Sequence, residues 1–65
     1  MNNERITVGQ FHNGETNMTA FVFKAERGFG VCLRDDDSGM YLPTTWTGYK
    51  TVDAANVKAD SLVRI

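Results

Sequence analysis

The segment from Ala20 to Trp46 constrains the fold of this chain more than any other, because apolar residues alternate along it between two turn segments. Alternation with a period of two is typical of strands that bury one face. The turn segments are residues 26–28, which end in Gly28, and residues 36–39, which place an Asp and a Gly where a type I turn prefers them. This segment therefore predicts three antiparallel strands joined by two short turns.

Large apolar side chains indicate how the first two of these strands pair. A three-residue loop at 26–28, with Gly28 in the left-handed conformation, would place Phe23 opposite Val31 on one face. The same register brings Phe21 opposite Leu33. The hydrophobic pattern therefore favours this loop over a two-residue one, and a shift by one residue would exchange the two faces of the strand.

The last of the three strands contains Pro43, which has no backbone N–H group for a ladder, so we expect an edge strand or an interruption there. Asp35 is expected opposite Met40 across the turn at 36–39. That register would bring together two apolar pairs, Leu33 with Leu42 and Phe29 with Trp46.

Elements on either side complete the predicted sheet and add a helix. Residues 5–11, in which Ile6 and Val8 alternate with other residues, predict a first strand, and the polar segment 12–17 contains the turn dipeptide Asn-Gly. Residues 52–63 predict a helix capped by Thr51 or Asp53. Its apolar stripe consists of Val52, Ala55, Ala59 and Leu62, with Val63 beside it.

Together these elements predict one small α+β domain over residues 1–65, an antiparallel meander of three to four strands with one C-terminal helix packed on one face. We expect the helix to cover the face with the largest side chains, because the two alanines of its stripe leave room for them. These side chains are Phe21, Phe23, Phe29 and Trp46.

Composition narrows the class of function. The 65 residues are 42% hydrophobic and 23% charged, which is typical of a folded domain, and the net charge of -1 provides no general attraction for nucleic acid or anionic lipid. Cys32 is the single cysteine, and no apolar run has the length of a signal peptide or a membrane span. We therefore expect a cytoplasmic protein without membrane association, and a homodimer is a reasonable way for so small a core to gain stability.

Residue types that support catalysis or metal binding are few and isolated. His12 has no second ligand at a recognisable spacing, and Cys32 lies mid-strand without a base placed beside it. The acidic run 35–37 departs from the order of an EF-hand loop, in which acidic ligands alternate and a Gly occupies the sixth position. We expect a loop histidine, a buried cysteine and a plain hairpin turn, with no catalytic residues, metal or cofactor.

Surface residues left outside the predicted core suggest binding instead. The sheet face away from the expected core would carry Val22, Cys32 and Tyr41 beside Arg34, a mixture too apolar for a simply solvated surface. Trp46 and Tyr49 form a second aromatic group near the fourth strand. The predicted binding residues are Val22, Cys32, Arg34, Tyr41, Trp46 and Tyr49.

These residues favour a small non-enzymatic binding protein that contacts another protein or a second copy of itself. One alternative is binding of single-stranded nucleic acid by the aromatic and basic residues, which a net charge of -1 does not favour. The other alternative is a small-molecule site at a subunit interface, because a chain of 65 residues has little interior for a pocket of its own.

Overall fold

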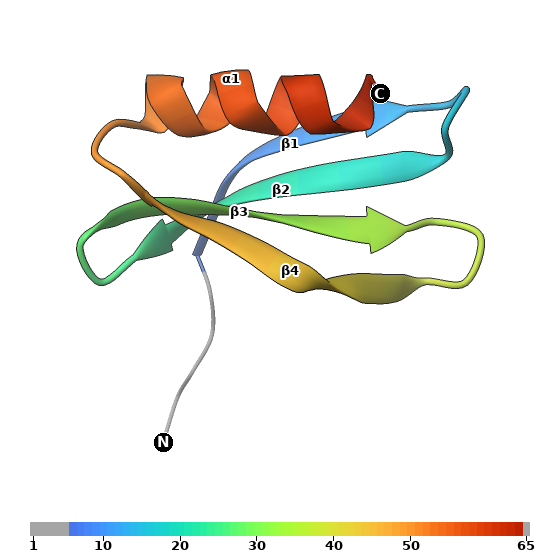
Figure 1. Cartoon of the computed structure of the whole chain (residues 1–65), viewed down its shortest axis with the longest axis horizontal. Coiled ribbons are helices and arrows are strands. Elements are labelled where there is room, and N and C mark those ends of the chain that lie inside the picture. The colour runs from blue at the N-terminus through green and yellow to red at the C-terminus, as the bar shows by residue number, and fades with distance from the viewer. Residues whose placement is uncertain (1–5, 65) are drawn as a thin grey trace.

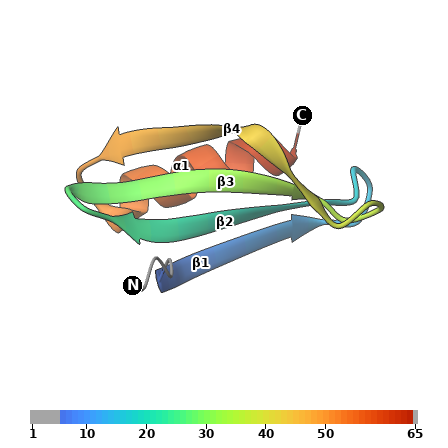
Figure 2. The same cartoon turned by 90° about the horizontal axis from the view of Figure 1, so that it is seen from below.

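A single antiparallel sheet followed by one helix makes up the chain (Figure 1). The computed structural model describes residues 6–64. Its elements are β1 (Ile6–Asn13), β2 (Met18–Ala25), β3 (Gly28–Asp35), β4 (Met40–Tyr49) and α1 (Val52–Val63). The strands lie in the order β1-β2-β3-β4, as Figure 2 shows from the side away from the helix, which confirms the predicted meander and its C-terminal helix. Strand β1 extends two residues beyond the predicted end, and residue 5 of that prediction lies outside the described residues.

Helix α1 begins at Val52, as the sequence predicts. Thr51 is its N-cap, and the Thr51 side chain accepts a hydrogen bond of 3.2 Å from the Ala54 backbone N–H. Its buried residues belong to the same hydrophobic cluster as residues of the two central strands. The cluster consists of Ala20, Val22, Val31, Leu33, Ala55, Ala59 and Val63. Larger side chains, among them Phe11, Phe29 and Trp46, are partly buried around this cluster. The core is thus a close contact between small side chains, surrounded by larger ones.

Strand β2 turns its other face toward the helix, so that Ala20 and Val22 are buried in the core where Phe21 and Phe23 were predicted. Ala25 pairs with Gly28 and Phe23 pairs with Gly30, so the turn between β2 and β3 contains two residues, Glu26 and Arg27. Val22 consequently pairs with Val31, and both side chains are fully buried in the core cluster. The three-residue loop and the placement of Phe21 and Phe23 in the helix-covered core were wrong, although Gly28 does have a positive φ of 107°.

Close packing on both sides of β2 explains this register. A Cβ atom at Gly30 would lie 2.5 Å from the Phe23 ring, so the missing side chain of the glycine provides the space that the ring occupies. On the helix side, Ala20 and Val22 meet Ala55 and Ala59, and all four residues are completely buried. Small side chains let the helix approach the sheet closely, whereas phenylalanines in the same positions would hold it away.

Strand β4 starts in the predicted register and then leaves it twice. Asp35 pairs with Met40 and Arg34 with Tyr41, but Cys32 next pairs with Thr45, so that Leu33 alone opposes residues 42–44. Pro43 lies within this irregularity, where no N–H group is required. A second irregularity contains Gly48, whose φ is 94°. The predicted pairs were therefore wrong: Trp46 pairs with Val31, and Phe29 pairs with Tyr49.

The loops of the two outer hairpins lie at one end of the sheet and share one hydrogen bond and a positive φ. In each four-residue loop the last residue, Asn17 or Gly39, has a positive φ and donates its backbone N–H to the carbonyl oxygen of Asn13 or Asp35. The loops contact each other through the Asp36 N–H, which donates to the Asn17 carbonyl at 3.0 Å. The turn between β2 and β3 lies at the opposite end (Figure 1).

Loop 14–17 also closes the C-terminal end of the helix. The Asn13 side-chain amide and the Thr16 hydroxyl both donate to the carbonyl oxygen of Val63, at 2.8 and 3.1 Å. A carbonyl in the last helical turn has no partner within the helix, so these two donors satisfy it. The first hairpin and the helix are therefore joined by polar contacts as well as by the core.

Replacing Gly30 by Ala tests the pairing of β2 with β3. We expect Gly30→Ala to lower the free energy of unfolding by about 1–3 kcal/mol, because the new methyl group overlaps the Phe23 ring. Gly14→Ala is the matched control, since a Cβ there meets nothing within 4 Å, and it should change stability by no more than about 0.5 kcal/mol. Urea denaturation measures both. If Gly30→Ala lowers the free energy of unfolding by the same amount in a Phe23→Leu background, the contact between position 30 and the Phe23 ring is contradicted.

Candidate functional site

The sheet face away from the core cluster, which we call the reverse face, carries three rows of paired residues. The register and the alternation of side chains place one row, formed by His12, Thr19, Arg34 and Tyr41, across all four strands beside the two hairpin loops. The middle row consists of Gln10, Phe21, Cys32 and Thr45. The third row consists of Thr7, Phe23 and Gly30.

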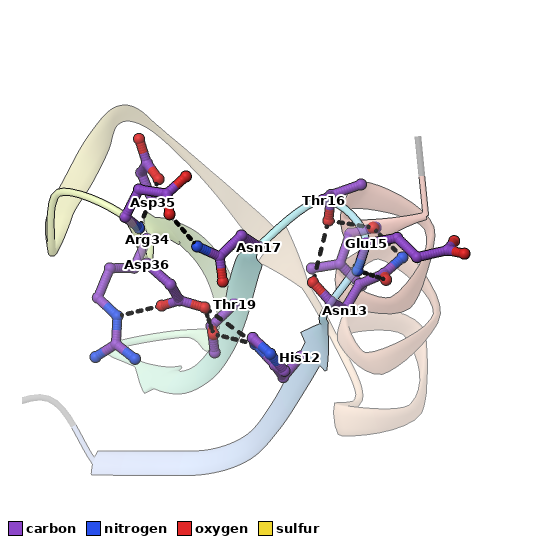
Figure 3. A network of polar contacts seen from close by, with 11 residues as sticks. His12, Asn13, Glu15, Thr16, Asn17, Thr19, Arg34, Asp35 and Asp36 are labelled. Carbon is purple, nitrogen blue, oxygen red and sulfur yellow. Dashed lines mark hydrogen bonds and ion pairs between the residues drawn. The ribbon is translucent and has the colours of Figure 1, made fainter.

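Asp36 organises the polar end of this face (Figure 3). Its two carboxylate oxygens accept hydrogen bonds from the Thr19 hydroxyl at 2.6 Å and from the Arg34 Nε at 2.9 Å. The His12 Nδ1 atom lies 3.0 Å from Asp36 Oδ2 and 3.0 Å from the Thr19 hydroxyl oxygen. Three strands and one loop therefore contribute to a single polar cluster.

Electrostatics in this cluster favour the charged forms of Asp36 and Arg34. The hydrogen bond from the Thr19 hydroxyl, together with Arg34, holds the pKa of Asp36 below its ordinary value, because both stabilise the carboxylate. Asp36 in turn raises the pKa of Arg34, chiefly through its hydrogen bond, and the hydroxyl of Tyr41 acts in the same direction. The guanidinium group is thus a permanent, positioned charge.

Arg34 connects the polar cluster to an aromatic group. Its guanidinium carbon lies 5.0 Å from the centroid of the Phe21 ring, which is the geometry of a cation–π contact. The Phe21 and Tyr41 rings are tilted by 46° with centroids 5.9 Å apart. Tyr41 is 58% exposed, so one end of this series of contacts faces solvent.

Two hollows lie on the reverse face, and the rings of the aromatic contact line the first of them. The first has a volume of ≈ 280 Å³ and is lined by Thr7, Phe21, Phe23, Cys32 and Tyr41. The second has a volume of ≈ 460 Å³ and is lined by Gln10, His12, Thr19, Arg34, Asp36 and Gly39. The face therefore offers an apolar recess beside a polar one.

The polar cluster contains hydroxyl, imidazole and carboxylate groups, but its geometry differs from that of a nucleophilic triad. The Thr19 hydroxyl donates its one proton to Asp36, and Thr19 is only 2% exposed, so a substrate has no access to the oxygen. Within residues 6–64 no group of three or more His, Cys, Asp or Glu residues is arranged to hold a metal ion. The arrangement orients Arg34 through its hydrogen bond to Asp36.

The predicted binding residues are divided among three environments. Cys32, Arg34 and Tyr41 lie on the reverse face, as expected. Val22 is completely buried beneath the helix and has no side-chain surface to offer. Trp46 and Tyr49 pack against the core cluster on the helix side, where the Lys58 Nζ lies 5.6 Å from the Trp46 ring centroid.

Sequence reasoning missed four members of the site. Phe21 was assigned to the core, Asp36 to a plain turn, and Thr19 received no role. His12 was expected to be solvated in a loop, but it lies in β1 and contacts Asp36. The alternation of Thr19 and Phe21 in β2 indicates that they share one face of the sheet, but the predicted register assigned that face to the helix-covered core.

Comparison of the chain with known protein families, with curated proteins and with solved structures finds no match. In the part of the chain that the structure describes, no helix has the length and apolar character needed to cross a membrane.

Titration of the Asp36 carboxyl group by NMR tests the polar cluster. We expect a pKa below the ordinary Asp value of 3.8, and a larger rise on Thr19→Val than on Arg34→Gln, because the Thr19 hydroxyl makes the largest contribution. Since the folded-state pKa is lowered, the stabilisation from Asp36 is present above the unfolded-state value and is lost as the pH falls through the folded-state value. Asp36→Asn should therefore be less stable than the wild type at neutral pH, with the difference vanishing in acid. A difference that persists at low pH would contradict this assignment.

Proposed function

We propose that this chain is a small non-enzymatic binding protein that contacts another protein through its reverse face, with Tyr41, Phe21 and Arg34 at the centre of the contact. The observation that carries the proposal is the exposed Tyr41 ring in contact with Phe21, which in turn contacts Arg34. Tyrosine and arginine are enriched at the energetic centres of protein interfaces. The single cysteine fits a reducing, cytoplasmic setting for such a protein.

Prior ordering of Arg34 supports this function. Binding normally costs about 0.5–1.5 kcal/mol for each flexible side chain that becomes fixed. Arg34 is already held by Asp36 on one side and by the Phe21 ring on the other, and its side chain is still 34% exposed. A partner that contacts the guanidinium group therefore meets a side chain that has lost much of its freedom during folding.

The apolar hollow supports the same proposal. It opens beside Tyr41 and is lined by Phe21 and Phe23, so it is suited to an apolar side chain of a partner. The neighbouring polar hollow supplies Gln10 and His12 at the rim. An apolar centre with a polar rim is the usual organisation of a protein interface.

Charges near this face favour a protein over a nucleic acid as the partner. Asp36 neutralises Arg34, and Glu15, Asp35 and Asp37 lie in or beside the adjoining loops. These carboxylates would repel a phosphate backbone that approached the aromatic residues. We therefore expect no salt-dependent binding of oligonucleotides at this face.

Site-specific photo-crosslinking tests the proposed surface. With a photoreactive phenylalanine analogue in place of Tyr41, we expect covalent adducts with protein in cells that make this chain. The matched control is the same analogue at Val57, which is 71% exposed on the helix, and it should give few adducts. Arg34→Ala should reduce the adducts at position 41. Equal labelling at both positions, or adducts with nucleic acid at position 41, would refute a protein contact through the reverse face.

A further inference from the structure

We propose that the partner is a second copy of this chain, packed reverse face to reverse face about a two-fold axis that runs across the strands. This inference depends on the proposed function and names the partner of the same surface. It would produce a four-layer arrangement with the two helices outside and the two sheets inside.

The charges of the described residues are separated along the strands. The end with the two outer hairpin loops carries Glu15, Asp35, Asp36 and Asp37, offset by Arg34. The opposite end, with the turn between β2 and β3 and the connection from β4 to the helix, carries Lys24, Arg27 and Lys50, offset by Glu26 and by Asp53 in the first turn of α1 (Figure 1). One end of the sheet is therefore acidic and the other is basic.

This separation selects one of the two symmetric arrangements open to two sheets packed face to face. A two-fold axis along the strands would place the acidic ends together and the basic ends together. An axis across the strands places each acidic end against the partner's basic end. Like charges within about 8–10 Å repel each other at physiological salt, so the second arrangement is favoured.

The same axis keeps each strand over its counterpart and reverses its direction. Lys50, directly after β4, then lies near the loop that contains Asp37 in the partner, and Arg27 lies between the partner's two loops. The middle row of the reverse face is nearest the axis, so Phe21 would meet the partner's Phe21. The centre of the contact is thus aromatic and both ends are paired charges.

The sheet face is modest in area. The chain measures 32 × 28 × 17 Å, and the face seen in Figure 2 spans its longest and its shortest dimension. A face of this size corresponds to the low end of protein interface areas, so the dimer should depend on concentration. Self-association also provides the additional stability that a core of this size needs.

Charge reversal at the two ends tests the arrangement. The acidic-end variant is Glu15→Lys with Asp37→Lys, and the basic-end variant is Arg27→Glu with Lys50→Glu; all four side chains are exposed. Light scattering and native mass spectrometry should show a dimer for the wild type and monomers for each variant alone. A mixture of the two variants should form heterodimers, because both pairs of facing ends regain opposite charges.

A third variant separates this contact from general attraction between oppositely charged proteins. Lys58→Glu with Arg64→Glu changes the net charge as the basic-end variant does, but on the helix. It should dimerise like the wild type and should form fewer heterodimers with the acidic-end variant than the basic-end variant does, because only one of the two facing pairs of ends would carry opposite charges. Circular dichroism of each protein shows whether it is folded, and heterodimer formation itself shows that both double variants can fold.

Three results would overturn the inference: a wild type that stays monomeric at high concentration, reversed variants that still dimerise, or heterodimers formed equally well with the helix variant. The proposed function has a separate outcome. Crosslinks from position 41 to a different protein, with a monomeric wild type, would support protein binding by the reverse face while excluding the second copy as its partner.

Discussion

Contact between small residues of helix α1 and strand β2 is the constraint on which the rest of the structure depends. Ala55 and Ala59 are completely buried against a cluster that includes Ala20 and Val22. Because side chains alternate along a strand, placing Ala20 and Val22 under the helix places Phe21 on the reverse face. The packing that forms the core therefore also supplies the aromatic centre of the proposed binding surface.

Polar contacts at the hairpin end hold this surface in place. Asp36 connects Thr19 of β2 to Arg34 of β3, and its own backbone N–H bonds to the loop that follows β1. That loop in turn satisfies the last carbonyl of the helix through Asn13 and Thr16. Arg34 is thus oriented by bonds that also stabilise the fold, which is why the proposed binding surface would lose little conformational freedom in a complex.

Local signals in the sequence predicted the elements well, because turns and caps depend on neighbouring residues. The helix cap at Thr51, the strand that ends at Ala25 and the pairing of Asp35 with Met40 all follow from residue types within a few positions. The pairing of β2 with β3 could not be decided in this way. Both faces of β2 are apolar, so the alternation of Phe21 and Phe23 with Ala20 and Val22 allows either face to be turned toward the helix. The larger size of the phenylalanines led to the prediction that their face is buried, which was wrong.

By itself, the sequence determined the three antiparallel strands from β2 to β4 and the ends of the helix, because each of these depends on local backbone preference or residue type, whereas it left the place of β1 open. Only the tertiary structure decided which face of β2 is buried, since that depends on how closely the helix approaches the sheet and on the space that Gly30 leaves for Phe23. The same packing removed Val22 from the predicted site and brought Asp36, Thr19 and His12 together from segments that are separate in the sequence.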